Sequence, residues 1–249
     1  MNTTNNTILI IGSSAGIGLS MAKQLSTLGN HVIMTGRNEA NLLKAAAPLQ
    51  NVTAIVCDVT SETDVDRLIA RVEKEFPKLN VIINNAGHAV VYNLASGADT
   101  YKNAKDEMET NFFSIARIND KILPLLSRQK EAAIVNVSSV VALVPGSLPT
   151  YSASKAALHS YTLSLRHALA DTNVKVFELM PPLVNTEFSA PIGGANGISP
   201  DEVAEHLIKG MADDTYEIHS GKTAFMYDLF RKSPQEAFAA LNAGRAPIN

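Results

Sequence analysis

The sequence predicts an α/β fold: a single doubly wound, Rossmann-type parallel sheet with helices on both faces, formed by residues 1–249. Two observations predict it. Short apolar runs rich in β-branched residues are nearly continuous, as strands buried on both faces should be. Amphipathic stretches separate these runs, and strand alternating with helix is typical of a parallel sheet. The runs cover residues 7–11, 31–35, 52–57, 80–84, 132–137 and 174–180.

The first two predicted strands are separated by GIGLSMAKQLSTLG, residues 16–29. Ile17, Met21, Leu25 and Leu28 fall on one face of a helix, and Gly29 provides a C-terminal stop. The stretch therefore predicts a helix that packs one apolar face on the sheet.

Two further helices are indicated by their first residues. Ser61 with Asp64 resembles a capping box, and Ser199 followed by Pro200 has the same character, with proline in the first turn. Five residues form the apolar stripe of the earlier helix: Val65, Leu68, Ile69, Val72 and Phe76. The segment PIGGANGIS, residues 191–199, lacks periodicity and predicts a mobile loop.

Composition narrows the function classes. The chain has 249 residues, 46% hydrophobic and 18% charged, with a formal net charge of −3. This charge gives no reason to expect nucleic acid or an anionic membrane as a partner. The single cysteine, Cys57, suits a reducing compartment. The start of the chain has neither a basic n-region nor a long apolar core, so we expect a cytoplasmic protein with no membrane span.

A glycine-rich segment follows the first predicted strand directly and leads into a helix. It reads Gly12-Ser13-Ser14-Ala15-Gly16-Ile17-Gly18, with the spacing G-x-x-x-G-x-G. Glycines here allow a sharp turn and a close approach of the backbone to a pyrophosphate, whose charge the helix N-terminus favours. Three glycines can also do no more than make a turn. Their position between strand and helix favours a dinucleotide site.

The end of the second predicted strand indicates which dinucleotide binds. An NAD site usually has an acidic residue there for the ribose hydroxyls, but this strand ends in Gly36-Arg37-Asn38. A guanidinium can bind a 2′-phosphate that a carboxylate would repel. Arg37 could instead be an ordinary solvated arginine. We predict NADP, with NADPH preferred and NAD less favoured.

Tyr151 and Lys155 are spaced i, i+4 in a predicted long helix, so their side chains share a face. A free tyrosine donates its proton poorly near neutral pH because its pKa is about 10. We expect the lysine ammonium to lower the tyrosine pKa and make a working acid/base pair. A serine hydroxyl nearby could hold a substrate oxygen. This chemistry needs no metal, and none is predicted.

Taken together, the motifs resemble those of the short-chain dehydrogenase/reductase family in its compact one-domain form. The matching motifs span nearly the whole chain and follow the order usual in the family. After the glycine loop come Asp58-Val59, NNAG at residues 84–87, Asn111, NVSS at residues 136–139, Tyr151-x-x-x-Lys155 and Pro181-x-x-Val184-x-Thr186. Three stretches, EFPKLNVIINNAG, YSASKAALHSYTLSLRHAL and PPLVNT, resemble the DltE-like branch, a label that gives no substrate.

The resemblance implies a role for each matching residue. Tyr151 would be the acid/base, Lys155 would tune it and hold the nicotinamide ribose, and Asn111 would support a water in a proton relay. Asp58 would accept from the adenine amino group, although it could equally be a helix-start acid. The other cofactor contacts implied are Gly12, Ser13, Ser14, Gly16, Ile17, Gly18, Arg37, Asn38, Val59, Asn85, Ala86, Gly87, Pro181, Val184 and Thr186.

Two positions depart from the family pattern. Ile11 replaces the usual threonine before the first glycine, so we expect the loss of a hydrogen bond that braces the neighbouring strand. Pro182 replaces the usual glycine after Pro181, and a second proline should stiffen this loop.

The serine doublet leaves a choice between Ser138 and Ser139. The spacing usual in the family, counted back from Tyr151, selects Ser138, whereas the motif NVSS selects Ser139. Loops tolerate deletion, but a one-residue slip turns a strand side chain to the opposite face. We therefore predict that Ser139 is catalytic and that Ser138 is a small buried residue or a minor cofactor contact.

The predicted function is hydride transfer between NADP(H) and a carbonyl or alcohol substrate. The alternative is a catalytically weak NADP-binding sensor or scaffold. An epimerase or dehydratase is disfavoured because the chain has no room for a second substrate domain. The predicted pocket wall is apolar, which favours an apolar or weakly polar small molecule. It contains Val90, Val91, Tyr92, Val141, Leu143, Leu148, Phe188 and Ile192.

The family resemblance also implies a homodimer or homotetramer. Its helices holding Asn111 and Tyr151 usually pair across a twofold axis. Four residues on the second helix form an apolar stripe that could serve such pairing, although such stripes are more often core: Leu158, Tyr161, Leu165 and Leu169.

Overall fold

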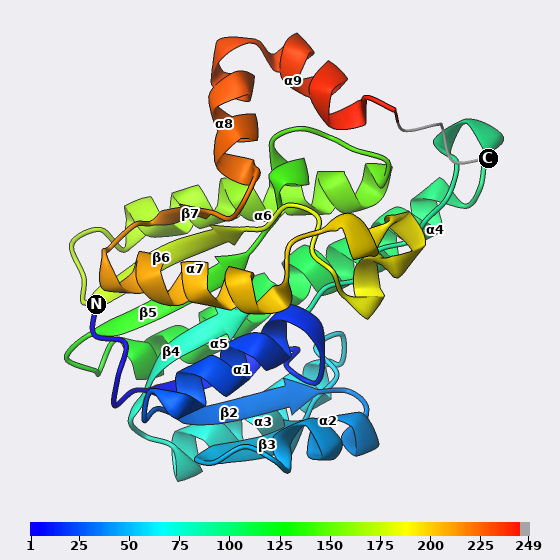
Figure 1. The fold of residues 1–249 in the computed structure, drawn as a ribbon. Coiled ribbons are helices and arrows are strands. Elements are labelled where there is room, and N and C mark those ends of the chain that lie inside the picture. The colour runs from blue at the N-terminus through cyan, green and yellow to red at the C-terminus, as the bar shows by residue number, and fades with distance from the viewer. Residues whose placement is uncertain (245–249) are drawn as a thin grey trace.

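Residues 1–244, which the computed structural model describes, form one sheet of seven parallel strands (Figure 1). The strand order is β3-β2-β1-β4-β5-β6-β7. The predicted doubly wound α/β fold is confirmed. The strands are β1 (Thr7–Ile11), β2 (His31–Gly36), β3 (Val52–Val56), β4 (Leu79–Asn84), β5 (Ala132–Val137), β6 (Val174–Met180) and β7 (Glu217–His219). The sequence analysis missed β7 because three residues, two of them polar, carry no periodic signal.

Helices cover both faces of the sheet (Figure 1). One layer holds α1 (Gly16–Thr27), α2 (Glu39–Ala46) and α7 (Pro200–Ala212), and the other holds α3 (Glu62–Glu75), α5 (Ser114–Leu126) and α6 (Pro149–Ala168). Helix α4 (Thr100–Met108) continues into α5 through a π-helical turn at Glu109–Phe113. Helices α8 (Thr223–Lys232) and α9 (Pro234–Asn242) project beyond the sheet.

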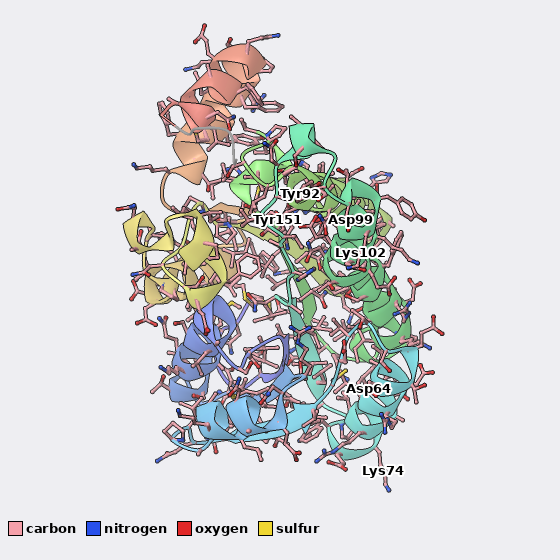
Figure 2. All side chains as sticks on the ribbon, turned by 90° about the vertical axis from the view of Figure 1, so that its right-hand side faces the viewer. Asp64, Lys74, Tyr92, Asp99, Lys102 and Tyr151 are labelled. Atoms are coloured by element: carbon pink, nitrogen blue, oxygen red, sulfur yellow. The ribbon has the colours of Figure 1, made fainter. Side chains whose placement is uncertain are left out.

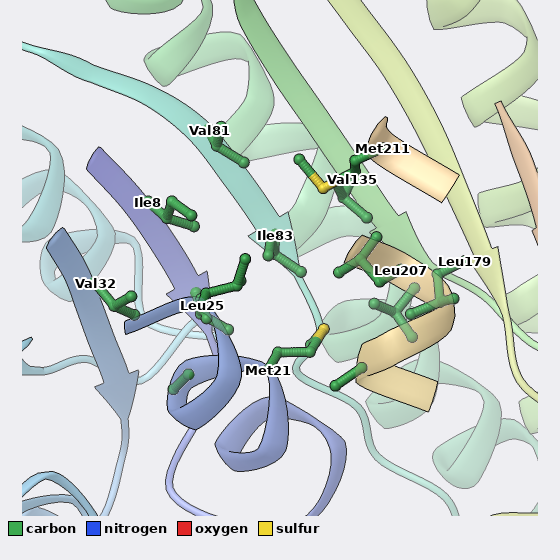
Figure 3. Close-up of a cluster of buried hydrophobic side chains, with 14 of the residues drawn as sticks. Ile8, Met21, Leu25, Val32, Val81, Ile83, Val135, Leu179, Leu207 and Met211 are labelled. Carbon is green, nitrogen blue, oxygen red and sulfur yellow. The ribbon is translucent and has the colours of Figure 1, made fainter. Parts of the chain in front are cut away.

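The predicted helix faces mostly match the buried ones. Met21 and Leu25 of α1 are fully buried among side chains of β1, β4 and α7 (Figure 3), whereas Leu28 is 39% exposed, contrary to expectation. Leu28 follows the last turn of α1 as its C-cap, so it no longer shares the buried face. On α6, Leu158 is fully buried, and Leu165 and Leu169 pack against the core. The apolar stripe on α6 is therefore largely core.

Two predicted helix starts are observed. The Ser61 hydroxyl accepts a hydrogen bond from the Asp64 amide at 3.3 Å, and the Ser199 hydroxyl accepts one from the Glu202 amide at 3.0 Å. The Asp64 carboxylate accepts from the Asp58 amide rather than closing a capping box. None of the described helices is long and apolar enough to cross a membrane.

Candidate active site

The glycine loop lies where the chain's winding direction reverses, between the carboxyl ends of β1 and β4, the usual place for a ligand in such sheets. Gly12 has a φ of +77°, and a Cβ there would lie 2.7 Å from Ala86 Cα. A Cβ on Gly18 would lie 2.1 Å from the Gly12 carbonyl oxygen. Asn85 donates to the same carbonyl at 2.6 Å. Only glycine fits these positions, because the loop packs closely against Asn85 and Ala86; its contact with a pyrophosphate remains a prediction.

A different brace replaces the one expected to be lost at Ile11. Ile11 is buried in the apolar core, and the link between β1 and β2 comes from Ser13 and Thr35 instead. The Ser13 amide donates to the Thr35 carbonyl at 2.8 Å, and the Thr35 amide donates to the Ser13 hydroxyl at 3.0 Å. The Gly12 amide also donates to the Thr35 hydroxyl at 3.3 Å. A polar residue at the end of an apolar run was the only sequence signal for Thr35.

The end of β2 lies beside the glycine loop. A Cβ on Gly36 would lie 3.2 Å from the Ser14 hydroxyl oxygen, and Arg37, the next residue, is exposed. This places an unburied guanidinium next to the loop predicted to bind phosphate. Asn38 caps α2 by accepting from the Asn41 amide at 2.9 Å. The observed role of Asn38 is therefore structural, and its cofactor contact remains a prediction.

Asp58 closes a turn ahead of α3 and does not lie in the first turn of that helix, where the acids are Glu62 and Asp64. One of its carboxylate oxygens accepts from the Thr60 amide at 3.0 Å and from the Thr60 hydroxyl at 2.7 Å. Its neighbour Val59 is buried in the core, 8% exposed. The adenine contact of Asp58 remains a prediction.

The two serines after β5 face different partners. Ser139 lies near enough to the Tyr151 phenol to lower its pKa. Ser138 donates to the Glu178 carboxylate, which is fully buried on β6. Successive residues of extended chain point to opposite sides, which explains the division. The geometry brings together the pair that the NVSS motif selected, Ser139 and Tyr151; its catalytic role remains a prediction.

Lys155 is buried one helical turn after Tyr151. Its Nζ donates to the Val137 carbonyl at 2.8 Å and lies 5.6 Å from the centre of the Tyr151 ring. Burial lowers the pKa of the Lys155 ammonium to about 8, against the opposing attraction of the Glu178 carboxylate. The lysine thus titrates near physiological pH rather than near its usual value.

The net lowering of the Tyr151 pKa that was expected from Lys155 is not found. Burial raises the pKa of the Tyr151 phenol above its usual value, and the buried Glu107 carboxylate raises it further. Desolvation of the phenolate by burial outweighs the opposing effect of Ser139. Tyr151 is therefore held in its protonated form, the form that a general acid requires.

Asn111 lies in the π-helical turn rather than in a regular helix. Its side-chain oxygen accepts from the His88 amide at 2.8 Å, and its amide nitrogen donates to the His88 carbonyl at 2.8 Å and to the Ser154 hydroxyl at 2.9 Å. Asn111 therefore ties the segment after NNAG to helix α6. The water relay implied by the resemblance remains a prediction.

The loop predicted to meet the nicotinamide is held from both sides. The Pro181 carbonyl accepts from the Val140 amide at 3.0 Å, and Val184 forms a bridge with Ile198. A Cβ on Gly16 would lie 3.2 Å from Thr186 Cγ2, so this loop reaches the glycine loop.

The segment predicted to be a mobile loop is more regular than expected. Its first two residues belong to a 3₁₀ turn at Glu187–Ile192, and it contains a second 3₁₀ turn at Gly194–Asn196. The Ser189 hydroxyl bonds to the Val184 carbonyl and holds the first turn. No apolar periodicity marks these residues in the sequence, because 3₁₀ turns are too short to show one.

Aromatic side chains surround the phenol. The rings of Tyr151 and Phe188 are 5.9 Å apart, centre to centre, and Phe188 is 49% exposed. The Tyr92 hydroxyl lies 3.0 Å from the Thr150 hydroxyl, which places Tyr92 beside the start of α6 (Figure 2). The predicted acid thus has an aromatic neighbour in Phe188 as well as the charged neighbours Glu107 and Lys155.

Comparison with known proteins identifies the family. The family model of the short chain dehydrogenases matches residues 6–196, more than three quarters of the sequence. The chain belongs to the short-chain dehydrogenase family.

Within this short-chain dehydrogenase family the chain belongs to the DltE-like branch. It is 39% identical over 248 residues to the uncharacterized oxidoreductase DltE of Bacillus subtilis, covering 97% of this chain and 98% of that protein. It is 28% identical over 233 residues to a fatty acyl-CoA reductase of Acinetobacter baylyi, covering 90% and 79%.

Solved structures of other short-chain dehydrogenases share the fold. One from Burkholderia cenocepacia, in complex with NADP, has a TM-score of 0.86 at 24% identity and covers 97% of this chain and 99% of its own. One from Burkholderia phymatum, in complex with NAD, has a TM-score of 0.86 at 21% identity, with complete coverage of both chains.

Sequence reasoning missed two buried acids of this short-chain dehydrogenase. Glu107 accepts from the Val90 amide at 2.8 Å and lies close enough to Tyr151 to affect its pKa. Glu178 lies inside the apolar run of β6, where it accepts from Ser138. The only available signal was the acid in an otherwise apolar strand.

Proposed function

We propose that this protein is an NADP-dependent oxidoreductase that interconverts a carbonyl compound and an alcohol. The observation that carries the proposal is the adjacency of the Ser139 hydroxyl and the Tyr151 phenol, with the buried Lys155 one turn further along the same helix. Asn111 ties this helix to the end of β4, next to the glycine loop. A hydroxyl, a phenol and an ammonium thus meet beside a cofactor cradle.

The geometry supports a simple division of labour in carbonyl reduction. The bound nicotinamide cofactor supplies the hydride. Ser139 donates a hydrogen bond to the substrate oxygen and holds it in place. Tyr151, kept protonated by its dry surroundings, gives its proton to the oxygen as negative charge develops there. Lys155, when charged, stabilises the phenolate that remains.

The preference for NADP rests on Arg37. The guanidinium is exposed directly after β2, where Gly36 approaches Ser14 of the glycine loop. A free guanidinium there can bind a 2′-phosphate, and an aspartate at the same place would repel it. We expect a lower KM for NADPH than for NADH, and the reverse order for Arg37→Asp. Equal use of both cofactors by the unmutated enzyme would refute the arginine argument.

For the substrate we propose an apolar or weakly polar carbonyl compound. The aromatic contact of Phe188 with Tyr151 and the position of Tyr92 support this class. The relative named fatty acyl-CoA reductase adds long-chain aldehydes to the compounds worth testing. The test is a panel of ketones, aldehydes and quinones assayed with NADPH and NADH. Normal NADPH binding with no reduction of any compound would favour a sensor or scaffold instead.

Location and assembly belong to the same proposal. We propose a cytoplasmic protein, which the buried, unpaired Cys57 fits, and a homodimer or homotetramer. Because the stripe on α6 is largely core, it does not support an interface. Cell fractionation tests the location, and light scattering of the purified chain gives the oligomeric state.

A further inference from the structure

Glu178 is an unusual residue for the centre of a sheet. It lies in β6 between Phe177 and Leu179 and is fully buried. Phe177 and Leu179 point into the core beneath α1 and α7, so Glu178 points to the opposite face, where α6 packs. A buried carboxylate is costly unless it is hydrogen-bonded or paired with charge. Its partners therefore indicate what it does.

Both carboxylate oxygens of Glu178 are occupied. Oε1 accepts from the Ser138 hydroxyl, and Oε2 lies 2.8 Å from His159 Nδ1. These two contacts fix the carboxylate against α6. His159 follows Lys155 by four residues, as Lys155 follows Tyr151, so all three side chains share one stripe of the helix. The catalytic stripe thus continues for one more turn and ends on a buried acid.

Other charged and titratable groups face this region from three elements. From α6 come Lys155, His159 and Arg166; from β7 come Glu217 and His219; and from α8 comes Asp228. Arg166 and Glu217 form an ion pair at 3.2 Å. His219 packs against the Tyr227 ring at 4.4 Å, and burial lowers its pKa.

Lys155 takes no part in these contacts. Its Nζ donates to a backbone carbonyl, and among residues 1–244 no carboxylate forms an ion pair with it. Lys155 and Glu178 are held by neighbouring residues, since the Val137 carbonyl accepts from Lys155 and the Ser138 hydroxyl donates to Glu178. Glu178 is the acid that raises the Lys155 pKa.

We propose that Glu178 is a positioning residue whose fixed negative charge keeps Lys155 protonated inside the protein. It touches neither substrate nor cofactor; it acts through Lys155. The consequence for catalysis rests on the proposed function, because a charged Lys155 is what stabilises the Tyr151 phenolate.

The pKa directions agree with this geometry. Burial lowers the pKa of Lys155, and Glu178 is the group that opposes the fall. Glu178 also raises the pKa of His159, so this one carboxylate stabilises the protonated forms of both side chains. At low pH the His159 cation neutralises much of its charge. When His159 loses its proton, the charge of Glu178 that acts on Lys155 is no longer partly neutralised.

The deciding experiment titrates Lys155 directly in the cofactor-free protein, by NMR of lysine labelled with carbon-13 at Cε. Lys155→Met assigns the signal. We expect Glu178→Gln, which keeps the shape and removes the charge, to lower the Lys155 pKa by about one pH unit. Glu178→Asp, which keeps the charge, should restore most of that shift. The matched control is Glu217→Gln, an acid on the neighbouring strand, which should leave the Lys155 pKa nearly unchanged.

A Lys155 pKa unaltered by Glu178→Gln, or lowered equally by Glu217→Gln, would overturn the proposal. If the glutamine variant does not fold, the unmutated protein still decides. The carbon-13 shift of the Glu178 carboxyl must be that of a carboxylate at pH 7, and a protonated carboxyl would overturn the proposal.

The same variants have a kinetic readout once a substrate is known. Glu178→Gln should move the alkaline limb of kcat for carbonyl reduction to lower pH by the same amount as the Lys155 pKa, with little change in KM. A uniform loss of kcat at every pH would show a merely structural role. Because the NMR titration needs neither cofactor nor substrate, its result stands even if the panel finds no activity.

Discussion

Removing one hydroxyl at a time from the Ser138–Ser139 doublet should separate catalysis from stability. Ser139 lies near Tyr151, and in the proposed mechanism Ser139→Ala removes a hydrogen bond to the substrate oxygen in the transition state. A loss of at least about tenfold in kcat follows, equivalent to about 1.4 kcal/mol. Stability should change little, because the other contacts of the Ser139 hydroxyl, to the Pro181 carbonyl and the Val141 amide, are both long, at 3.4 and 3.3 Å.

Ser138→Ala should do the opposite. It removes the donor to a buried carboxylate and leaves Glu178 Oε1 without that partner. An unsatisfied buried group costs about 1–3 kcal/mol, which lowers the melting temperature by several degrees in a chain of this size. Most of the turnover should remain, because Ser138 does not face the phenol.

The assay pairs steady-state kinetics with thermal unfolding on the two variants and the unmutated protein. The reasoning requires opposite rankings in the two measurements. It is refuted if Ser138→Ala is the slower enzyme, because the count of residues back from Tyr151 would then have been the right guide. It is equally refuted if both variants lose activity and stability in parallel.

Two further variants test other parts of the structure. Gly18→Ala would place a Cβ 2.1 Å from the Gly12 carbonyl oxygen. Because the backbone must shift to admit it, we expect NADPH binding to weaken at least about tenfold in a fluorescence titration. Unchanged affinity would contradict the loop geometry. His159→Gln tests the pair with Glu178, which raises the pKa of His159. The pair's contribution is fully present below the unfolded-state pKa of histidine and is lost as pH rises through the folded-state value. The destabilisation measured by urea unfolding should therefore be largest below about pH 6 and shrink as pH rises through the raised folded-state pKa of His159; a constant difference would rule out a charge effect.

The fold was predictable because its signals are repetitive. Six of the strands are apolar runs with clear ends, and Ser61 and Ser199 mark helix starts by a local hydrogen bond that needs no tertiary information. Strand β7 was not predictable, because three residues at the sheet edge are held by their neighbour β6 rather than by a pattern of their own. The 3₁₀ turns after Thr186 were not predictable either, because turns this short show no periodic pattern.

The site divides in a similar way. Positions in one helix, such as Tyr151 and Lys155, follow from spacing alone. The pKa values do not, because they depend on how far the folded chain excludes water and on acids distant in sequence, such as Glu107 and Glu178. The hydrogen bonds of Thr35 could not be predicted either, because they join two strands through side chains rather than through a local motif.

The strand order also has a consequence for how the chain is made. β1 lies between β2 and β4, so one of its edges pairs with a strand that follows soon after, and the other waits for Leu79–Asn84. During synthesis, a unit of β1, β2 and β3 can therefore assemble while the apolar edge of β1 is still open. Open apolar edges favour association between nascent chains. The edge of β1 that pairs with β4 therefore stays open until Leu79–Asn84 has been made.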